Sequence, residues 1–174
     1  MKKHLSCITL VLSMALTLGF AGCGKSKEDE KKGAEGKAAE GKTEAKGPSM
    51  LKLDKLDGLQ VEVPADTKAG DAIGGKGVML QGAGLVMTLE PGEGKPEDAD
   101  KAKEDVDMYT PQDLKVEKLE DGFLLTFTNK GGMGTNYWLT GRRTIDGKAY
   151  WCSTTAAKPE FVESAVKACK SLKK

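Results

Sequence analysis

Runs of apolar residues that alternate with polar ones cover most of this chain from residue 50 onward and predict β-strands. Three Asp-Gly pairs, at 57–58, 121–122 and 146–147, lie between such runs. Because Asp-Gly accepts the positive backbone angles of tight turns, we predict three hairpins or tight turns in an antiparallel sheet. The predicted strands are 51–56, 59–63, 77–81, 84–90, 113–119, 123–128, 135–145 and 148–154.

Two segments have helical rather than alternating periodicity. The first opens at Pro96 with acidic residues in its first turn, and Ala99, Ala102 and Val106 then recur at helical spacing. The second covers 159–172 and has one continuous apolar face. Together these elements predict an α+β fold, an antiparallel sheet of about six to eight strands with two helices packed on it.

The first 23 residues have the layout of an export signal. Lys2 and Lys3 precede the apolar run 5–20, and Ala21-Gly22 stand immediately before Cys23. This arrangement resembles the signal peptide of a bacterial lipoprotein, although Phe20 occupies the place where leucine is usual. The resemblance implies removal of residues 1–22 and acylation of Cys23. The alternative is ordinary secretory cleavage that leaves Cys23 unmodified.

Residues 23–48 predict an acylated N-terminus followed by a disordered tether, because this stretch has no aromatic residues and repeats the polar motif "AEGK". The globular domain is then 49–174. Loss of Lys2 and Lys3 would change the net charge from +1 to −1, so nothing in the composition indicates nucleic acid as a partner. Gly24 stands where an aspartate would, in the enteric sorting rule, retain the protein at the inner membrane, which favours the outer membrane.

A nucleotide-binding pattern overlaps the export signal. Gly19, Gly24, Lys25 and Ser26 satisfy G-x-x-x-x-G-K-[ST]. That loop works between a buried strand and a helix, whereas the residues after Ser26 are polar on every face and interrupted by glycines. Cleavage before Cys23 would also divide the motif. We therefore expect no nucleotide partner.

Two cysteines, Cys152 and Cys169, remain in the predicted domain, and in an oxidising compartment they are expected to form a disulfide rather than two free thiols. A hairpin turn at 146–147 would place one face of its strands against the last helix. That face carries Leu139, Gly141, Ile145, Tyr150 and Cys152. The opposite face carries Trp138, Thr140, Arg142, Thr144, Trp151 and Ser153.

This second, half-polar face is the candidate binding surface, with Trp138, Arg142 and Trp151 as its first residues. Either the first helix covers it, or part of it is open with Arg142 stacked on Trp151. If it is open, an Arg142→Ala, Trp151→Ala variant should keep its thermal stability and lose its partner.

The chain offers little catalytic chemistry. Its single histidine, His4, lies in the predicted signal peptide, which removes histidine-dependent nucleophiles and the usual zinc and iron sites from the mature chain. The acidic string at 97–107 lacks the glycine and final glutamate of a calcium loop. We expect no catalytic residues, no metal and no cofactor. The alternative is a small envelope hydrolase that uses a pair of carboxylates.

The order of elements also resembles a known fold. The turn into "GLQVEVP", a glycine-rich return, a helix before an antiparallel meander, and "GKAYWCSTT" followed by a helix with "ACKSL" resemble the Mog1/PsbP-like fold, as in bacterial lipoproteins of the DcrB kind. The resemblance implies an α/β sandwich without catalytic residues, because members serve mainly as binding or assembly factors. We therefore expect a lipid-anchored envelope module that binds an envelope protein or glycan.

Overall fold

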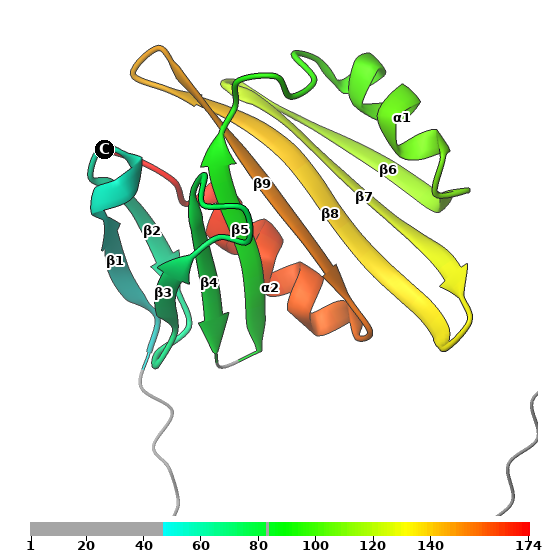
Figure 1. Ribbon diagram of the computed structural model, residues 1–174, viewed down its shortest axis with the longest axis horizontal. Helices are drawn as coiled ribbons and strands as arrows, with labels where there is room; N and C mark the ends of the chain where they lie inside the picture. Colours follow the sequence, from blue (N-terminus) through cyan, green and yellow to red (C-terminus); the bar gives the residue numbers. More distant parts are fainter. Residues whose placement is uncertain (1–46, 83) are drawn as a thin grey trace, which may run out of the picture. The chain divides into compact units, whose positions relative to one another are not determined.

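The computed structural model describes residues 47–82 and 84–174, which form an α+β fold of two antiparallel sheets and two α-helices (Figure 1). This confirms the predicted fold class. The strands are β1 (Ser49–Leu53), β2 (Leu59–Val63), β3 (Lys68–Asp71), β4 (Val78–Gly82), β5 (Leu85–Pro91), β6 (Gln112–Leu119), β7 (Gly122–Gly131), β8 (Gly134–Ile145) and β9 (Lys148–Ala156). The helices are α1 (Ala99–Asp107) and α2 (Pro159–Lys170), and a short 3₁₀ helix, η1 (Asp54–Leu56), follows β1.

The larger sheet has seven strands in the order β3-β4-β5-β9-β8-β7-β6, with every neighbouring pair antiparallel. Its central hairpin, β8–β9, has the predicted register, with Ile145 opposite Lys148 and Gly141 opposite Cys152. The turn residues Asp146 and Gly147 have φ angles of 49° and 74°. These positive values are those that a tight two-residue hairpin turn requires.

The other two Asp-Gly pairs also lie at hairpin connections, between β1 and β2 and between β6 and β7, but these loops differ in detail from two-residue Asp-Gly turns. The loop between β1 and β2 is longer, because η1 occupies residues 54–56, which were predicted as strand. At the second pair, Leu119 lies opposite Gly122, so the turn is Glu120-Asp121 and Gly122 already belongs to β7. A Cβ atom on Gly122 would overlap the carbonyl oxygen of Arg142, which explains the glycine at this strand position.

One strand, β3, was not predicted. Its sequence, Lys-Ala-Gly-Asp, contains no large apolar residue, and all four residues are exposed. It pairs with β4 at the edge of the seven-stranded sheet, Lys68 lying opposite Gln81. Backbone pairing with β4, together with an exposed ion pair between Lys55 and Asp71, places this segment, and hydrophobic patterning gives no signal for it.

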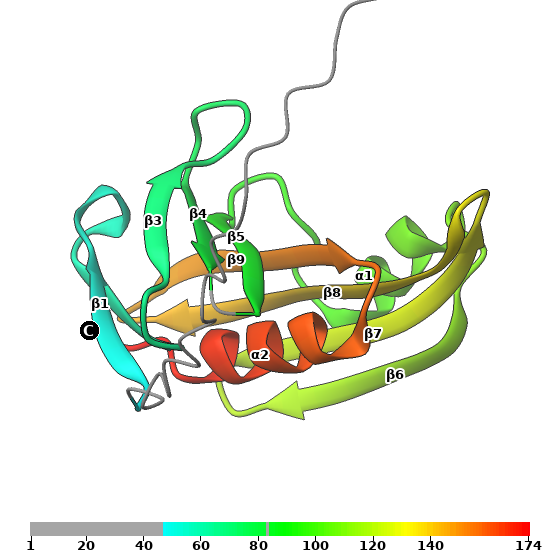
Figure 2. The same ribbon diagram turned by 90° about the horizontal axis from the view of Figure 1, so that it is seen from below.

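Helix α2 and the small β1–β2 sheet cover one face of the large sheet (Figure 2). Val162, Ala165 and Cys169 are buried at helical spacing on α2. They pack with Leu139 and Cys152 of the central hairpin in the larger of the two hydrophobic clusters. The main core is thus the layer between α2 and the sheet, on the face that the sequence predicts.

Helix α1 packs on the opposite face, over β7. The side chain of Asp98 caps it by accepting hydrogen bonds from the backbone N–H groups of Asp100 (3.1 Å) and Lys101 (2.9 Å), so the helix begins three residues later than Pro96. Ala102 and Val106 are its buried residues. Across 47–82 and 84–174, neither helix has the length and apolar character needed to cross a membrane.

Candidate functional site

The candidate binding residues Trp138, Arg142 and Trp151 lie on one face of the β8–β9 hairpin, the face on which α1 packs. Arg142 is directly opposite Trp151, and Trp138 is opposite Thr155. The three side chains differ in exposure: Trp151 is 7% exposed, whereas Trp138 and Arg142 are half-buried. The face is therefore partly covered and partly open.

Trp151 belongs to the second hydrophobic cluster. Its ring meets Phe123 edge-on, with centroids 6.2 Å apart and planes at 76°. Ala102 and Val106 of α1 complete the same cluster. At this position the helix covers the sheet, and Trp151 contributes mainly to packing.

Arg142 holds a loop. Its Nη1 atom donates hydrogen bonds to the carbonyl oxygens of Gly92 (3.0 Å) and Pro96 (3.3 Å), in the segment between β5 and α1. The guanidinium thus connects the loop that precedes α1 to strand β8. This contact was not predicted, because it joins residues 46 and 50 positions apart.

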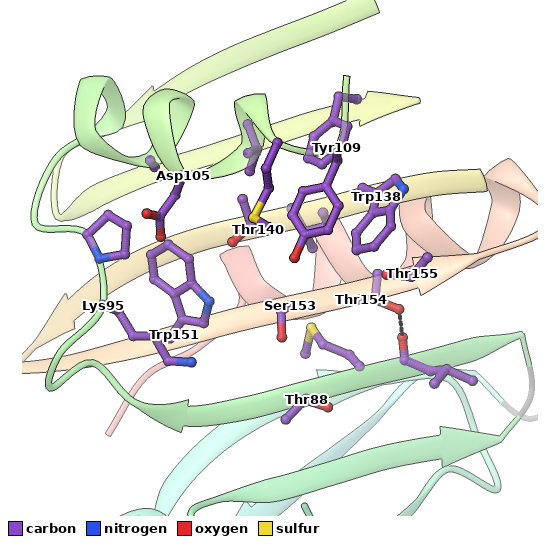
Figure 3. Close-up of a pocket in the computed structure, with 18 of the residues that line it drawn as sticks. Thr88, Lys95, Asp105, Tyr109, Trp138, Thr140, Trp151, Ser153, Thr154 and Thr155 are labelled. Carbon is purple, nitrogen blue, oxygen red and sulfur yellow. Dashed lines mark hydrogen bonds between the residues drawn. The ribbon is translucent and has the colours of Figure 1, made fainter. Parts of the chain in front are cut away.

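A cavity of about 620 Å³ lies on this face between α1 and strands β5, β9 and β8 (Figure 3). Its floor carries three hydroxyl side chains in register, since Thr88 and Thr140 both lie opposite Ser153. The one hydrogen bond drawn among its lining residues joins Thr154 Oγ1 to the carbonyl of Val86 (2.5 Å). The three floor hydroxyls are therefore available to a ligand.

Stacked aromatic rings form one end of the cavity. The rings of Tyr109 and Trp138 stack with centroids 4.8 Å apart, and Trp138 stacks in turn on Phe127 at 5.5 Å. Tyr109 is 41% exposed, and its ring projects over the cavity (Figure 3). We call Tyr109 and Trp138 the aromatic pair.

Asn129 fixes the aromatic pair in place. Its Oδ1 atom accepts a hydrogen bond from Trp138 Nε1 (2.9 Å), and its Nδ2 atom donates one to the carbonyl of Tyr109 (3.2 Å). Asn136 Nδ2 donates a further hydrogen bond to the same Oδ1 (3.2 Å). One side chain therefore orients the indole of Trp138 and fixes the backbone of Tyr109, whose ring stacks on that indole, so the pair is held together before any ligand arrives.

The opposite end of the cavity carries one cation and one anion, Lys95 and Asp105, near Trp151 (Figure 3). Lys95 Nζ is paired with Glu90 Oε2 at 2.8 Å. Asp105 is exposed, and it is the one carboxylate among the lining residues. The lining therefore offers an anionic ligand no unpaired cation.

A second groove, of about 840 Å³, lies on the other face between α2 and strands β6 and β7. Val162, Val166 and Leu124 contribute apolar surface to it. An ion pair between Lys170 of α2 and Glu117 of β6, at 2.6 Å, joins the two sides of this groove. Phe127 and Trp138 are among its lining residues, but Tyr109 and the row of Thr88, Ser153 and Thr140 are not.

The pairing of Cys152 with Cys169 that the sequence predicts is present as a disulfide, with Cα atoms 6.2 Å apart. It joins β9 to α2 on the face away from the cavity. Gly141 lies opposite Cys152 on this face. A Cβ atom on Gly141 would lie 2.5 Å from Leu124 Cδ2 and 2.7 Å from the carbonyl oxygen of Phe123, so the neighbouring strand β7 is what requires the glycine.

Part of the cavity could be predicted from the sequence. Strand alternation places Trp138, Thr140 and Ser153 on the same face. Tyr109, which follows α1, and Asn129 on β7 were not predicted. An aromatic residue just after an amphipathic helix was the available signal for Tyr109, and nothing local marks Asn129.

The proposed lipid site Cys23, the signal peptide 1–22, the tether up to residue 46 and the Gly19–Ser26 motif lie outside the described residues. In the part of the chain that the structure describes, no group of three or more His, Cys, Asp or Glu side chains is arranged to hold a metal ion. No protein-family model matches this chain, and no curated protein matches it.

Proposed function

We propose that this chain is a lipid-anchored, non-catalytic binding module of the cell envelope and that the cavity beneath α1 is its ligand site. The observation that carries the proposal is the aromatic pair held by Asn129 beside a row of available hydroxyls. Aromatic side chains are among those that most often carry binding energy. When the rings are already ordered, binding of a ligand loses little conformational entropy in ordering them.

The alternative, a small hydrolase, would use two carboxylates that converge on a substrate. The lining of the cavity offers Asp105 alone, and the nearby Glu90 is engaged with Lys95. These features support binding over hydrolysis as the proposed function.

The proposed anchor is the acylated Cys23, with the outer membrane as its location. A flexible tether of this length and composition would hold the domain roughly 25 to 30 Å from the lipid on average. The module would then meet an envelope protein or glycan close to the membrane.

Photocrosslinking in intact cells tests the binding proposal. A benzophenone amino acid replaces Met108, which is 79% exposed and lines the cavity, or, as a matched control, Met133, a fully exposed methionine in the β7–β8 turn that does not line it. We expect a crosslinked partner at position 108 only, and its loss when Tyr109→Ala is added. Equal crosslinking at both positions, or no effect of Tyr109→Ala, would contradict the proposal.

A further inference from the structure

We infer that the ligand of the cavity is an uncharged glycan, a chain of neutral pyranose units; this inference rests on the binding function proposed above. A pyranose ring presents an apolar C–H surface and a rim of hydroxyl groups. The cavity presents the two complements of these features, aromatic rings and hydroxyl side chains, next to each other.

The floor matches the rim of a sugar. Thr88, Ser153 and Thr140 lie side by side on the adjacent strands β5, β9 and β8, so their spacing across the sheet is about 5 Å from one to the next. A hydroxyl group both donates and accepts hydrogen bonds. The row can therefore pair with sugar hydroxyls whichever way these point, and it does so without a charged group.

The wall matches the apolar surface of a sugar. Trp138 and Trp151 lie on opposite sides of the hydroxyl row, and Tyr109 stacks on Trp138 (Figure 3). Tyr and Trp combine a large apolar ring with a polar tip, so they contact C–H groups while remaining near water. The exposed face of Tyr109 is the first surface that a sugar ring would meet.

Charge and backbone pairing favour a neutral glycan over other ligands. An anionic ligand would lose hydration without finding a free counter-charge, because Lys95, the one cation in the lining, is paired with Glu90. A peptide bound in extended form would need an open sheet edge. The strands under the cavity are β5, β9 and β8, which have neighbours on both sides, and the edges of the large sheet are β3 and β6.

Calorimetric titration of the purified full-length chain with sugar hexamers tests the inference. The probes are the β-1,4-linked hexamers of glucose and of N-acetylglucosamine, and the anionic β-1,4-linked hexamer of glucuronic acid serves as the charged counterpart. We expect at least one neutral hexamer to bind, with a Kd at least about tenfold lower than that of the anionic one. Loss of one hydrogen bond corresponds to about a fivefold increase in Kd, so Thr140→Val and Ser153→Ala should each have that effect.

Thr144→Val is the matched control, because Thr144 is on the same face of β8 as Thr140 but does not line the cavity. Its Kd should stay within about twofold of the parent. If Thr140→Val fails to fold, Thr88→Val tests the same row from β5. The inference is overturned if no neutral hexamer binds, or if Thr144→Val weakens binding as much as the floor variants do.

The two proposals fail in different ways. If no hexamer binds while Tyr109→Ala still abolishes crosslinking at position 108, the glycan is wrong and the binding site stands. If the crosslinked species is then a protein, the ligand of the cavity is that protein and not a glycan. If Tyr109→Ala leaves crosslinking unchanged, the binding function itself is wrong.

Discussion

Arg143 donates hydrogen bonds to both carboxylate oxygens of Asp121, at 2.8 and 2.7 Å. Its Nη1 atom donates a third to the carbonyl oxygen of Cys169, at 2.6 Å. This buried guanidinium therefore connects the β6–β7 turn, strand β8 and the last turn of α2. Planar, bidentate pairing of this kind is specific to arginine.

Replacing Arg143 by leucine should lower the free energy of unfolding by about 2 kcal/mol, because Asp121 and the Cys169 carbonyl both lose a partner while Asp121 stays partly hydrated. Urea denaturation measures the effect. Lys103→Leu, which removes an exposed pair with Asp100, should change stability by about 0.5 kcal/mol or less. Equal effects of the two variants would show that the Arg143 network contributes no more to the free energy of unfolding than an exposed ion pair does.

The disulfide should stabilise the fold by about 3 kcal/mol, the chain-entropy value for a loop of this size. A Cys152→Ala, Cys169→Ala variant should lose that amount in urea denaturation. Mass mapping of the unreduced protein should recover the two cysteines in one linked peptide pair. Recovery of both as alkylatable thiols from fresh envelopes would contradict the assignment.

If the Trp138 face were open, an Arg142→Ala, Trp151→Ala variant would keep its thermal stability. Because Trp151 is buried in the structure, we expect this variant to lose stability instead. We expect Trp151→Ala alone to cost about 3 to 5 kcal/mol, because it leaves a cavity beside Phe123 and α1. Thermal unfolding of each single variant separates the contributions. A melting temperature unchanged by Trp151→Ala would mean that the cluster repacks without loss.

Asn129 is a positioning residue, and its role is measurable apart from stability. In Asn129→Ala, the indole N–H of Trp138 loses its acceptor, so its hydrogen exchange should speed up at least about tenfold by NMR. The indole N–H of Trp151 provides an internal reference, and Trp138→Phe assigns the two signals. Equal acceleration of both signals would indicate general loosening instead.

The exposed pair of Asp57 and Lys148 gives a pH dependence. A hydrogen bond from Lys148, together with its charge, lowers the pKa of Asp57 from its usual 3.8. The contribution of Asp57 to stability is therefore present above the unfolded pKa and lost as the pH falls through the folded one. Asp57→Asn should flatten the stability profile as the pH falls through and below that usual value.

Lys148→Met supplies the second arm of that experiment. It removes the largest cause of the lowered pKa of Asp57, but the charge of Lys174 continues to lower that pKa, so Lys148→Met should flatten the acid profile less than Asp57→Asn does. Equal slopes for the two variants would show that Lys174 contributes nothing.

Much of the fold could be predicted because alternation and turn chemistry are local. The 146–147 turn determines the register of β8 and β9, and that register determines which residues face α2. Strand β3 could not be predicted, because Lys68 to Asp71 bury nothing and are ordered by pairing with β4. Turn placement at Asp121 also failed, since contact with Arg142 rather than backbone angle explains Gly122.

The site could be predicted only where it follows from strand alternation. Trp138, Thr140 and Ser153 share a face for that reason. The cavity itself depends on how α1 lies across the sheet, and on Asn129 reaching Tyr109 twenty residues away. Such contacts between distant segments leave no periodic signal in the chain.

Cys152 sits between Trp151 and Ser153 on β9, so one strand forms part of the cavity with one face and anchors the disulfide with the other. Both sulfur-bearing residues are fully buried, so a reductant reaches them only after α2 or β9 opens. Opening of β9 requires a ligand to leave the cavity, whereas opening of α2, on the other face, does not. At one hundred times its Kd, a ligand would therefore slow reduction about a hundredfold through the first route and leave the second unchanged, which makes the rate of thiol release a measure of which element opens.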